Sequence, residues 1–167
     1  MTEQPQAMTA KYRQDYQAPL YWCDSLDLDF QLQEPLTRVT AISRLRRSGD
    51  HNEPLVLDGE GLDLVSVSVD GVPYQQYEQG ESSLTLFNLP AECVLTVVTD
   101  IDPAANTALE GLYKSGDAYC TQCEAEGFRR ITYYMDRPDI LARYSTRITA
   151  DRSEEHTSEL QSHSDLV

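Results

Sequence analysis

The sequence predicts an all-β fold, most simply a sandwich or a pair of open curved sheets, and three observations lead to this prediction. Apolar and polar residues alternate over several short segments, which is the period of a strand with one buried face. Glycine, proline and aspartate separate these segments and signal turns. The chain has 167 residues, 40% of them hydrophobic, which suffices for the core of one domain.

The first predicted element is a hairpin of two strands. Leu26, Leu28, Phe30 and Leu32 alternate with polar residues, and the strand 26–32 ends before Pro35. The weaker alternation over residues 37–43 predicts a second strand that pairs with the first. The polar sequence Ser48-Gly49-Asp50 then predicts a turn.

The middle of the chain continues this pattern of short strands. The strands predicted here are 55–57, 64–69, 72–77, 83–87 and 93–98. Asp70-Gly71 between two of them is the strongest hairpin signal in the chain, because a tight hairpin turn requires positive φ, which glycine adopts at little cost. Residues 93–98 are apolar and β-branched on both faces, which predicts a central strand buried on two sides.

The last third of the chain is less regular. Residues 109–113 are expected to resume a strand, and residues 128–135 are rich in the β-branched and aromatic side chains that strands favour. Pro138 near the start of residues 138–143 is compatible with one or two helical turns, the short helical segment of the predicted fold. Tyr144, Thr146 and Ile148 alternate as a final strand.

The charge and the termini exclude several classes of function. The formal net charge is -15 at pH 7, which argues against nucleic-acid partners and anionic membranes because both attract lysine and arginine. The first residues lack the apolar core of a signal peptide, and no run approaches the roughly 20 apolar residues that span a bilayer. The cytoplasm is therefore the expected compartment, where the four cysteines would be reduced.

The final segment, residues 152–167, does not follow the strand pattern. It reads RSEEHTSELQSHSDLV and has no apolar periodicity. With one choice of codons, residues 152–163 back-translate to a common sequencing-adapter read that begins AGATCGGAAGAGC. We therefore expect one β-domain over residues 1–151 and interpret residues 152–167 as a translated adapter, expected to be disordered.

Cys120 and Cys123 form a CxxC sequence with three possible interpretations. A zinc knuckle requires two further ligands, and neither the other cysteines nor His51 has a partner at ligand spacing. A redox pair is expected at the start of a helix in a βαβ unit, which the surrounding pattern does not predict. The favoured interpretation is structural, with both cysteines acting as small buried apolar residues beside a loop.

The polar residues around this pair suggest a binding site. Gln122, Glu124 and Glu126 lie at i, i+2 and i+4, so an extended segment would present them on one face. A carboxamide and two carboxylates on one face could bind a cation such as an ammonium group. Ordinary surface acids on a solvated edge are the alternative, and the pattern alone favours them.

One long motif identifies a family. Residues 106–144, and above all the sequence TQCEAEGFRRITYYMDRPD, closely resemble the zinc-dependent aminopeptidase N family of gluzincin metallopeptidases, particularly its bacterial cytosolic members. The resemblance extends upstream through KYRQDYQAP, LDGEGLDLVSV and FNLP. It therefore covers essentially residues 1–151.

The resemblance implies a fold, a partner and two site residues. It implies the N-terminal β-domain of such an enzyme, a saddle of sheets that packs on the catalytic domain of the same chain. It also implies that Glu124 accepts hydrogen bonds from the α-ammonium of a peptide substrate, while Gln122 lines the pocket for the first side chain. Glu126 matches the motif without an expected contact to substrate.

The same resemblance implies what the 167 residues lack. The family's HExxH zinc sequence does not occur in them, so the catalytic zinc is expected only in the full-length parent. We expect the parent to remove N-terminal amino acids from peptides, and we expect the 167-residue chain to bind no zinc and to be inactive. The alternative is a freestanding, non-catalytic β-sandwich that acts as a binding or interaction module.

Overall fold

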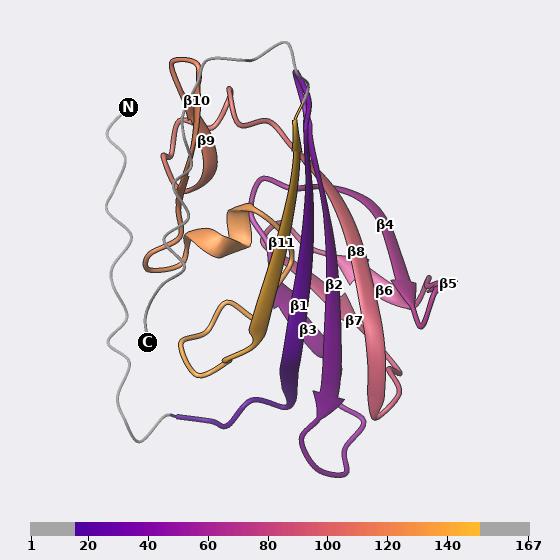
Figure 1. Cartoon of the computed structure of the whole chain (residues 1–167). Coiled ribbons are helices and arrows are strands. Elements are labelled where there is room, and N and C mark those ends of the chain that lie inside the picture. The colour runs from indigo at the N-terminus through magenta and orange to yellow at the C-terminus, as the bar shows by residue number, and fades with distance from the viewer. Residues whose placement is uncertain (1–15, 151–167) are drawn as a thin grey trace, which may run out of the picture.

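The computed structural model of the protein describes residues 16–150, which form three sheets and one short 3-10 helix (Figure 1). The strands of the largest sheet, in spatial order, are β11 (Arg143–Ala150), β1 (Tyr21–Leu32), β2 (Thr37–Arg47), β8 (Glu92–Ile101), β4 (Asp63–Val69) and β5 (Val72–Pro73). A smaller sheet contains β3 (Leu55–Asp58), β7 (Ser83–Leu86) and β6 (Tyr77–Gln79), and β9 (Gly111–Ser115) pairs with β10 (Ala118–Gln122). All strand pairs are antiparallel except β1 with β11. The all-β prediction is confirmed.

The first hairpin forms as predicted and is longer than its alternating residues indicated. β1 and β2 pair antiparallel from Gln31 opposite Arg38 to Tyr21 opposite Arg47, with one irregularity next to Cys23. The extra length precedes Leu26, where the alternation of the sequence is interrupted at this irregularity. A shift of register reverses the face that the following side chains occupy, so the pattern becomes unreadable there.

The Asp70-Gly71 turn is also confirmed. Both residues have positive φ, 51° and 78°, as a two-residue hairpin turn requires. The strand predicted over residues 72–77 is wrong in extent, because β5 contains only Val72 and Pro73 and the chain then enters the smaller sheet as β6. Proline has no amide hydrogen for a ladder, which is consistent with the short strand.

Strand β8 is central, as predicted, but it is not equally buried on both faces. It pairs with β2 on one side and with β4 on the other. Cys93, Leu95 and Val97 are buried, whereas the intervening Val94 and Thr96 are only half-buried. The expectation of two-sided burial was wrong because the smaller sheet covers only one face of the large sheet.

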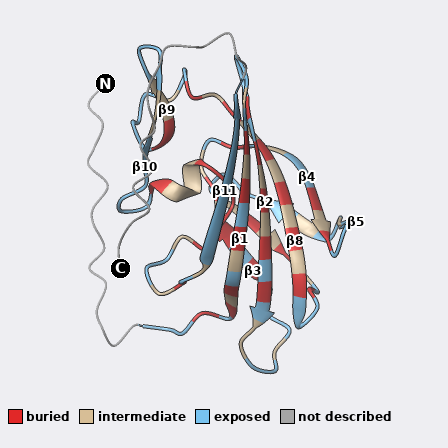
Figure 2. Ribbon diagram, in the orientation of Figure 1, coloured by how far each residue is buried: buried red, intermediate tan, exposed pale blue. Residues whose placement is uncertain are grey.

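The hydrophobic core lies between the large sheet and the smaller sheet (Figure 2). Both layers contribute side chains with at most 2% exposure, among them Leu26, Val39, Leu95 and Val97 from the large sheet and Leu55, Leu84 and Leu86 from the smaller one. The segment after the 3-10 helix closes one side of this core with Ile131, Tyr133, Tyr134 and Met135.

Two expectations for the last third of the chain need correction. Residues 128–135 do not form a strand, since Gly127–Arg130 is the 3-10 helix and only Tyr134 makes a β-bridge, with Asp58. Residues 138–143 contain a turn at Pro138 and Asp139 and no helix, and Arg143 already begins β11, so the short helical segment lies earlier than predicted. The aromatic and β-branched residues of this segment pack into the core individually and not along a strand. The composition that strands favour was therefore misleading here.

No helix within residues 16–150 is long and apolar enough to cross a membrane. The predicted adapter segment, residues 152–167, lies outside the described residues, as does the beginning of the predicted domain.

Candidate functional site

The candidate site is the loop that follows the β9–β10 hairpin. Gln122 is the last residue of β10 and pairs with Gly111, the first residue of β9. The chain then turns through residues 123–126, and this turn is closed by a hydrogen bond from the amide of Gly127 to the carbonyl of Cys123 at 3.0 Å. Gln122 and Glu124 are both exposed, so the hairpin presents them to solvent at the end of a defined backbone.

The extended segment on which the three polar residues would share one face does not form beyond Gln122. Only Gln122 lies in a strand, whereas Glu124 and Glu126 lie in the turn. The period of two applies only to extended backbone, so it does not place these side chains together. The peptide bond between Glu124 and Ala125 is cis.

Two glycines allow the ends of this loop to approach each other. A Cβ atom on Gly127 would overlap the carbonyl oxygen of Gln122. Gly111 has φ of +72°, and a Cβ atom there would lie 2.7 Å from Cβ of Arg130. Only glycine fits such close backbone contacts without displacement, so these two residues fix the path of the loop.

An ion pair attaches the loop to the smaller sheet. Arg129 donates to Asp136 from its backbone amide at 3.2 Å, from Nε at 3.0 Å and from a terminal nitrogen to the carbonyl at 3.3 Å. The amide of Asp136 donates in turn to Oδ2 of Asp58 in β3 at 3.1 Å. The Arg129 and Asp136 side chains are only 17% and 13% exposed, where such hydrogen bonds are stronger than at the surface. We call the side chains of Arg129, Asp136 and Asp58 the loop anchor.

The charges around the loop leave one carboxylate free. Glu126 contacts Arg129 at 3.5 Å, and Arg130 contacts Glu60 at 2.8 Å and Glu110 at 3.3 Å. Among residues 16–150, the side chains of Gln122 and Glu124 form no hydrogen bond or ion pair. The loop can therefore offer a carboxylate and a carboxamide to a ligand without first breaking an internal contact.

The sequence did not indicate the residues that hold this loop. Asp58 of the loop anchor is distant in the chain from Gly111, Gly127, Arg129 and Asp136, and these residues follow no recognisable spacing. The only available signal was the long family motif, which contains Gly127, Arg129 and Asp136.

The structural interpretation of the CxxC pair is wrong in one respect. All four cysteines are free, and Cys120 is half-buried whereas Cys123 is exposed, so the pair does not act as two buried apolar residues. Although Cys123 reaches the surface, partial desolvation raises the pKa of its thiol, and the negative charge of Asp136 adds to this effect. A raised pKa disfavours the thiolate that redox chemistry and metal binding use.

The described residues do not fit a zinc site. Within residues 16–150, no group of three or more histidine, cysteine, aspartate or glutamate side chains is placed to hold a metal ion. His51 instead lies 3.0 Å from the carbonyl of Leu20 and accepts a hydrogen bond from the amide of Glu53. Its environment is that of a structural histidine.

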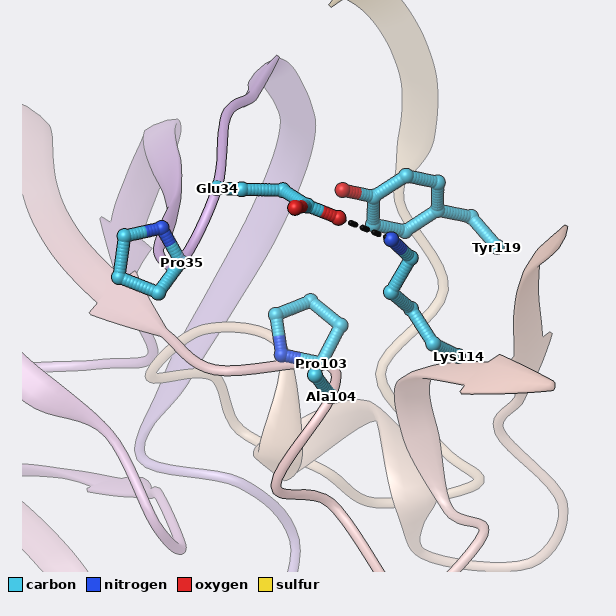
Figure 3. A pocket seen from close by; sticks show the side chains of 6 residues that line it. All are labelled: Glu34, Pro35, Pro103, Ala104, Lys114 and Tyr119. Atoms are coloured by element: carbon cyan, nitrogen blue, oxygen red, sulfur yellow. Dashed lines mark hydrogen bonds and ion pairs between the residues drawn. The ribbon is translucent and has the colours of Figure 1, made fainter. Parts of the chain in front are cut away.

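Two of the hollows on the described surface can be compared with the candidate residues. One hollow of about 340 Å³ lies between the β1–β2 turn and the β9–β10 hairpin and contains the ion pair of Lys114 with Glu34, beside the ring of Tyr119 (Figure 3). Another of about 310 Å³ is bordered by Glu60, Arg130 and neighbouring residues. Gln122 and Glu124 line neither of these two hollows.

The fold and the loop together define an all-β domain that presents one polar loop. Comparison with known families then places it: the model of the Peptidase M1 N-terminal domain matches residues 14–165, and the chain belongs to this family. This confirms the resemblance inferred from the motif. The match extends beyond residue 151, and the domain boundary expected there remains a prediction.

The chain is similar to several bacterial proteins. It is 55% identical over 152 residues to aminopeptidase N of Escherichia coli K12, which covers 91% of this chain and 17% of that protein. It is 48% identical over 147 residues to aminopeptidase N of Haemophilus influenzae, which covers 86% of this chain and again 17% of the relative. The chain therefore spans about a sixth of the length of these relatives.

Solved structures show the same fold. Aminopeptidase A of Legionella pneumophila in complex with aspartic acid has a TM-score of 0.79 and 31% identity over 86% of this chain and 18% of that one. An M1 zinc metallopeptidase of Deinococcus radiodurans has a TM-score of 0.66 at 19% identity, over 80% of this chain and 33% of its own. At that identity the likeness supports the fold alone.

Proposed function

We propose that this domain supplies the loop that recognises the free α-amino group of a peptide in a zinc-dependent aminopeptidase. In this proposal Glu124 accepts hydrogen bonds from the substrate ammonium, and Gln122 borders the pocket for the first side chain. The full-length parent removes N-terminal amino acids from peptides. Its catalytic domain, packed against this one, provides the second wall of the cleft and the zinc.

The observation that carries the proposal is the unpaired state of these two side chains on an anchored backbone. Glu126, two residues further on, already contacts Arg129, whereas Glu124 has no such contact among the described residues. A binding residue must be held in place by its backbone and must remain free at its functional atoms. Glu124 and Gln122 meet both requirements, and the family to which the chain belongs supplies the class of substrate.

A carboxylate at this position provides the selectivity that an exopeptidase needs. Charge-assisted hydrogen bonds are about twice as strong as neutral ones, and they strengthen when water is excluded. The ammonium at the N-terminus of a peptide can form them, but an internal amide cannot. Closure of the second wall over Glu124 would desolvate the carboxylate, and binding of an uncharged group there would leave it unpaired.

The experiment uses a chimera in which residues 16–150 replace the matching segment of E. coli aminopeptidase N. Hydrolysis of an aminoacyl anilide is measured for the chimera and for its Glu124→Gln and Glu124→Ala variants. Loss of hydrogen bonds to a charged group costs about 1.5–3 kcal/mol, so Glu124→Ala should lower kcat/KM about 10- to 150-fold. Glu124→Gln, which keeps an acceptor without the charge, should have a smaller effect.

The matched control is Glu126→Gln, which changes an acid in the same loop that is already paired. It should alter kcat/KM less than about threefold. The unfused 167-residue chain should release no anilide that depends on zinc. Kinetics of Glu124→Ala equal to those of Glu126→Gln would remove Glu124 from the site.

A further inference from the structure

The end of β3 holds the part of the chain that follows the candidate loop. Asp58 exchanges two backbone hydrogen bonds with Tyr134, at 2.7 Å from its own amide and at 3.0 Å from the amide of Tyr134. Oδ2 of Asp58 accepts a hydrogen bond from the amide of Asp136 at 3.1 Å. The amide of Glu60 donates to the carbonyl of Arg129 at 3.0 Å. The chain therefore leaves the loop along a path that β3 determines.

Gly59 allows this part of the chain to approach β3 closely. A Cβ atom on Gly59 would overlap the ring of Tyr133. Because Gly59 does not have a positive φ, the position requires glycine for space and not for its backbone conformation. Tyr133 is buried, and its hydroxyl accepts a hydrogen bond from Nε2 of Gln79 in β6 at 3.1 Å. The ring is therefore held on both sides and cannot give way easily.

Strand β3 is itself fixed in the core. It pairs antiparallel with β7, from Leu55 opposite Leu86 to Asp58 opposite Ser83. Leu55 and Leu57 are only 2% and 3% exposed. A residue that positions another must be held by its own packing and hydrogen bonds, and the end of β3 meets this condition.

The two ends of the loop are attached to different parts of the domain. The upstream end, Gln122, pairs with Gly111 in the β9–β10 hairpin, which forms a two-stranded sheet of its own. The downstream end is attached through Asp58 and Gly59 to the three-stranded sheet of β3, β7 and β6. Glu124 lies in the turn between these two attachments. A shift of the downstream end would therefore change where the Glu124 carboxylate lies.

We propose that Asp58 and Gly59 are positioning residues for the contact between Glu124 and the substrate ammonium, an inference that rests on the function proposed for the loop. Neither residue needs to touch the substrate. Hydrogen bonds weaken steeply when their distance or angle departs from the preferred range, and a misplacement of about 1 Å can lower activity about 100-fold. The end of β3 thus determines how well the Glu124 carboxylate meets the ammonium.

The test uses the aminopeptidase chimera and the aminoacyl anilide described above. Asp58→Ala removes the acceptor for the amide of Asp136 and should lower kcat/KM at least about fivefold. Its effect should not exceed that of Glu124→Ala, because a positioning residue cannot contribute more than the contact that it positions. Gly59→Ala, which forces the ring of Tyr133 away, should have an effect similar to that of Asp58→Ala. Asp58→Asn keeps an oxygen acceptor and should stay within about threefold of the unmodified chimera.

A double-mutant cycle separates positioning from a general loss of structure. In the chimera that already carries Glu124→Ala, Asp58→Ala and Gly59→Ala should each change kcat/KM less than about twofold, because the contact that they position is absent. A substitution that unfolds or loosens the whole domain would instead lower kcat/KM equally with and without Glu124. Circular dichroism and thermal unfolding of each variant measure the folded fraction.

The matched control is Glu60→Gln, which changes the next acid along the chain and keeps its backbone amide. The Glu60 side chain forms a partly exposed ion pair with Arg130, so kcat/KM should change less than about twofold. Equal losses with and without Glu124, unchanged kinetics of Asp58→Ala and Gly59→Ala, or an equal loss for Asp58→Asn or Glu60→Gln would each overturn the inference. Unchanged kinetics of Glu124→Ala alone would instead refute the proposed function, and the inference with it.

Discussion

The large sheet and the site segment, residues 111–138, are stabilised in different ways. In the sheet, β1, β2 and β8 pair along long ladders, and every second side chain enters the same core. In the site segment, single contacts determine the structure: two glycines that permit close approach, and the loop anchor of Arg129, Asp136 and Asp58. Many similar contacts stabilise the sheet, whereas the structure of the loop depends on a few contacts of different kinds.

This difference bears on the binding role that we propose for the loop. A loop that is held by few contacts can be changed without unfolding the core, which lets one framework carry different sites. It also means that the loop should open more easily than the sheet. The predictions below test whether the two regions respond separately.

The largest effect is expected in the sheet, for Leu95→Ala in β8. Leu95 is 1% exposed at the centre of the core, so the substitution leaves a cavity and should lower the free energy of unfolding by about 2–5 kcal/mol. Urea denaturation measures the change. Leu141→Ala is the control, because Leu141 is 85% exposed and its loss should cost less than about 0.5 kcal/mol. A similar cost for both variants would contradict the assignment of the core.

A smaller and local effect is expected in the loop, for Arg129→Ala. The substitution removes the side-chain hydrogen bonds to Asp136 and leaves that carboxylate, 13% exposed, without its cation. Loss of hydrogen bonds to a charged group should cost about 2 kcal/mol. Amide exchange in residues 122–130 should accelerate, while exchange in β2 and β8 keeps its rate.

The control for the loop is Arg130→Ala. Arg130 is the neighbouring arginine in the 3-10 helix, and its ion pairs with Glu60 and Glu110 are more exposed. Such surface pairs contribute about 0–1 kcal/mol, so the loop amides should exchange nearly as in the unmodified chain. If Arg129→Ala and Arg130→Ala had the same effect, the loop anchor would have no special role.

The same difference explains which parts of the structure could be predicted from the sequence. The alternation around Leu26 and Phe30 predicted β1, and Asp70-Gly71 predicted a turn that forms with positive φ at both residues. These signals are local, since a strand and a tight turn each require a pattern within a few residues. The pairing of β1 with β11 was not predicted, because it joins residues more than 100 positions apart.

The candidate site segment was chosen from the sequence, but its geometry could not be predicted from the sequence. Gln122 and Glu124 were chosen from the family motif, and their role is still a prediction. The turn at Glu124 and the path of the loop depend on contacts between Gly127 and Gln122 and between Asp136 and Asp58. Such contacts arise only when separate elements pack together, so the periodicity of apolar and polar residues in the sequence does not indicate them. The composition of residues 128–135 was misleading for the same reason.

The smallest effect concerns the ion pair that the sheet carries on its surface. Arg38 in β2 and Asp100 in β8 are register partners, and Nε and a terminal nitrogen of Arg38 donate to the two carboxylate oxygens at 2.8 Å. The Arg38 side chain is 47% exposed, unlike the arginine of the loop anchor. The hydrogen bonds from Arg38 lower the pKa of Asp100, and they outweigh the opposing effect of desolvation.

This lowered pKa determines how stability should depend on pH. Because the carboxylate binds protons less tightly in the folded state, the pair stabilises the fold above the ordinary aspartate pKa of about 3.9 and loses its effect as the pH falls below that value. Asp100→Asn should therefore cost about 0.2–1 kcal/mol at neutral pH, and the cost should shrink towards zero in acid. Urea denaturation at several pH values measures it, with Asp117→Asn in the exposed β9–β10 turn as the control. A cost that stayed constant down to about pH 2 would mean that Asp100 acts through packing and not through its charge.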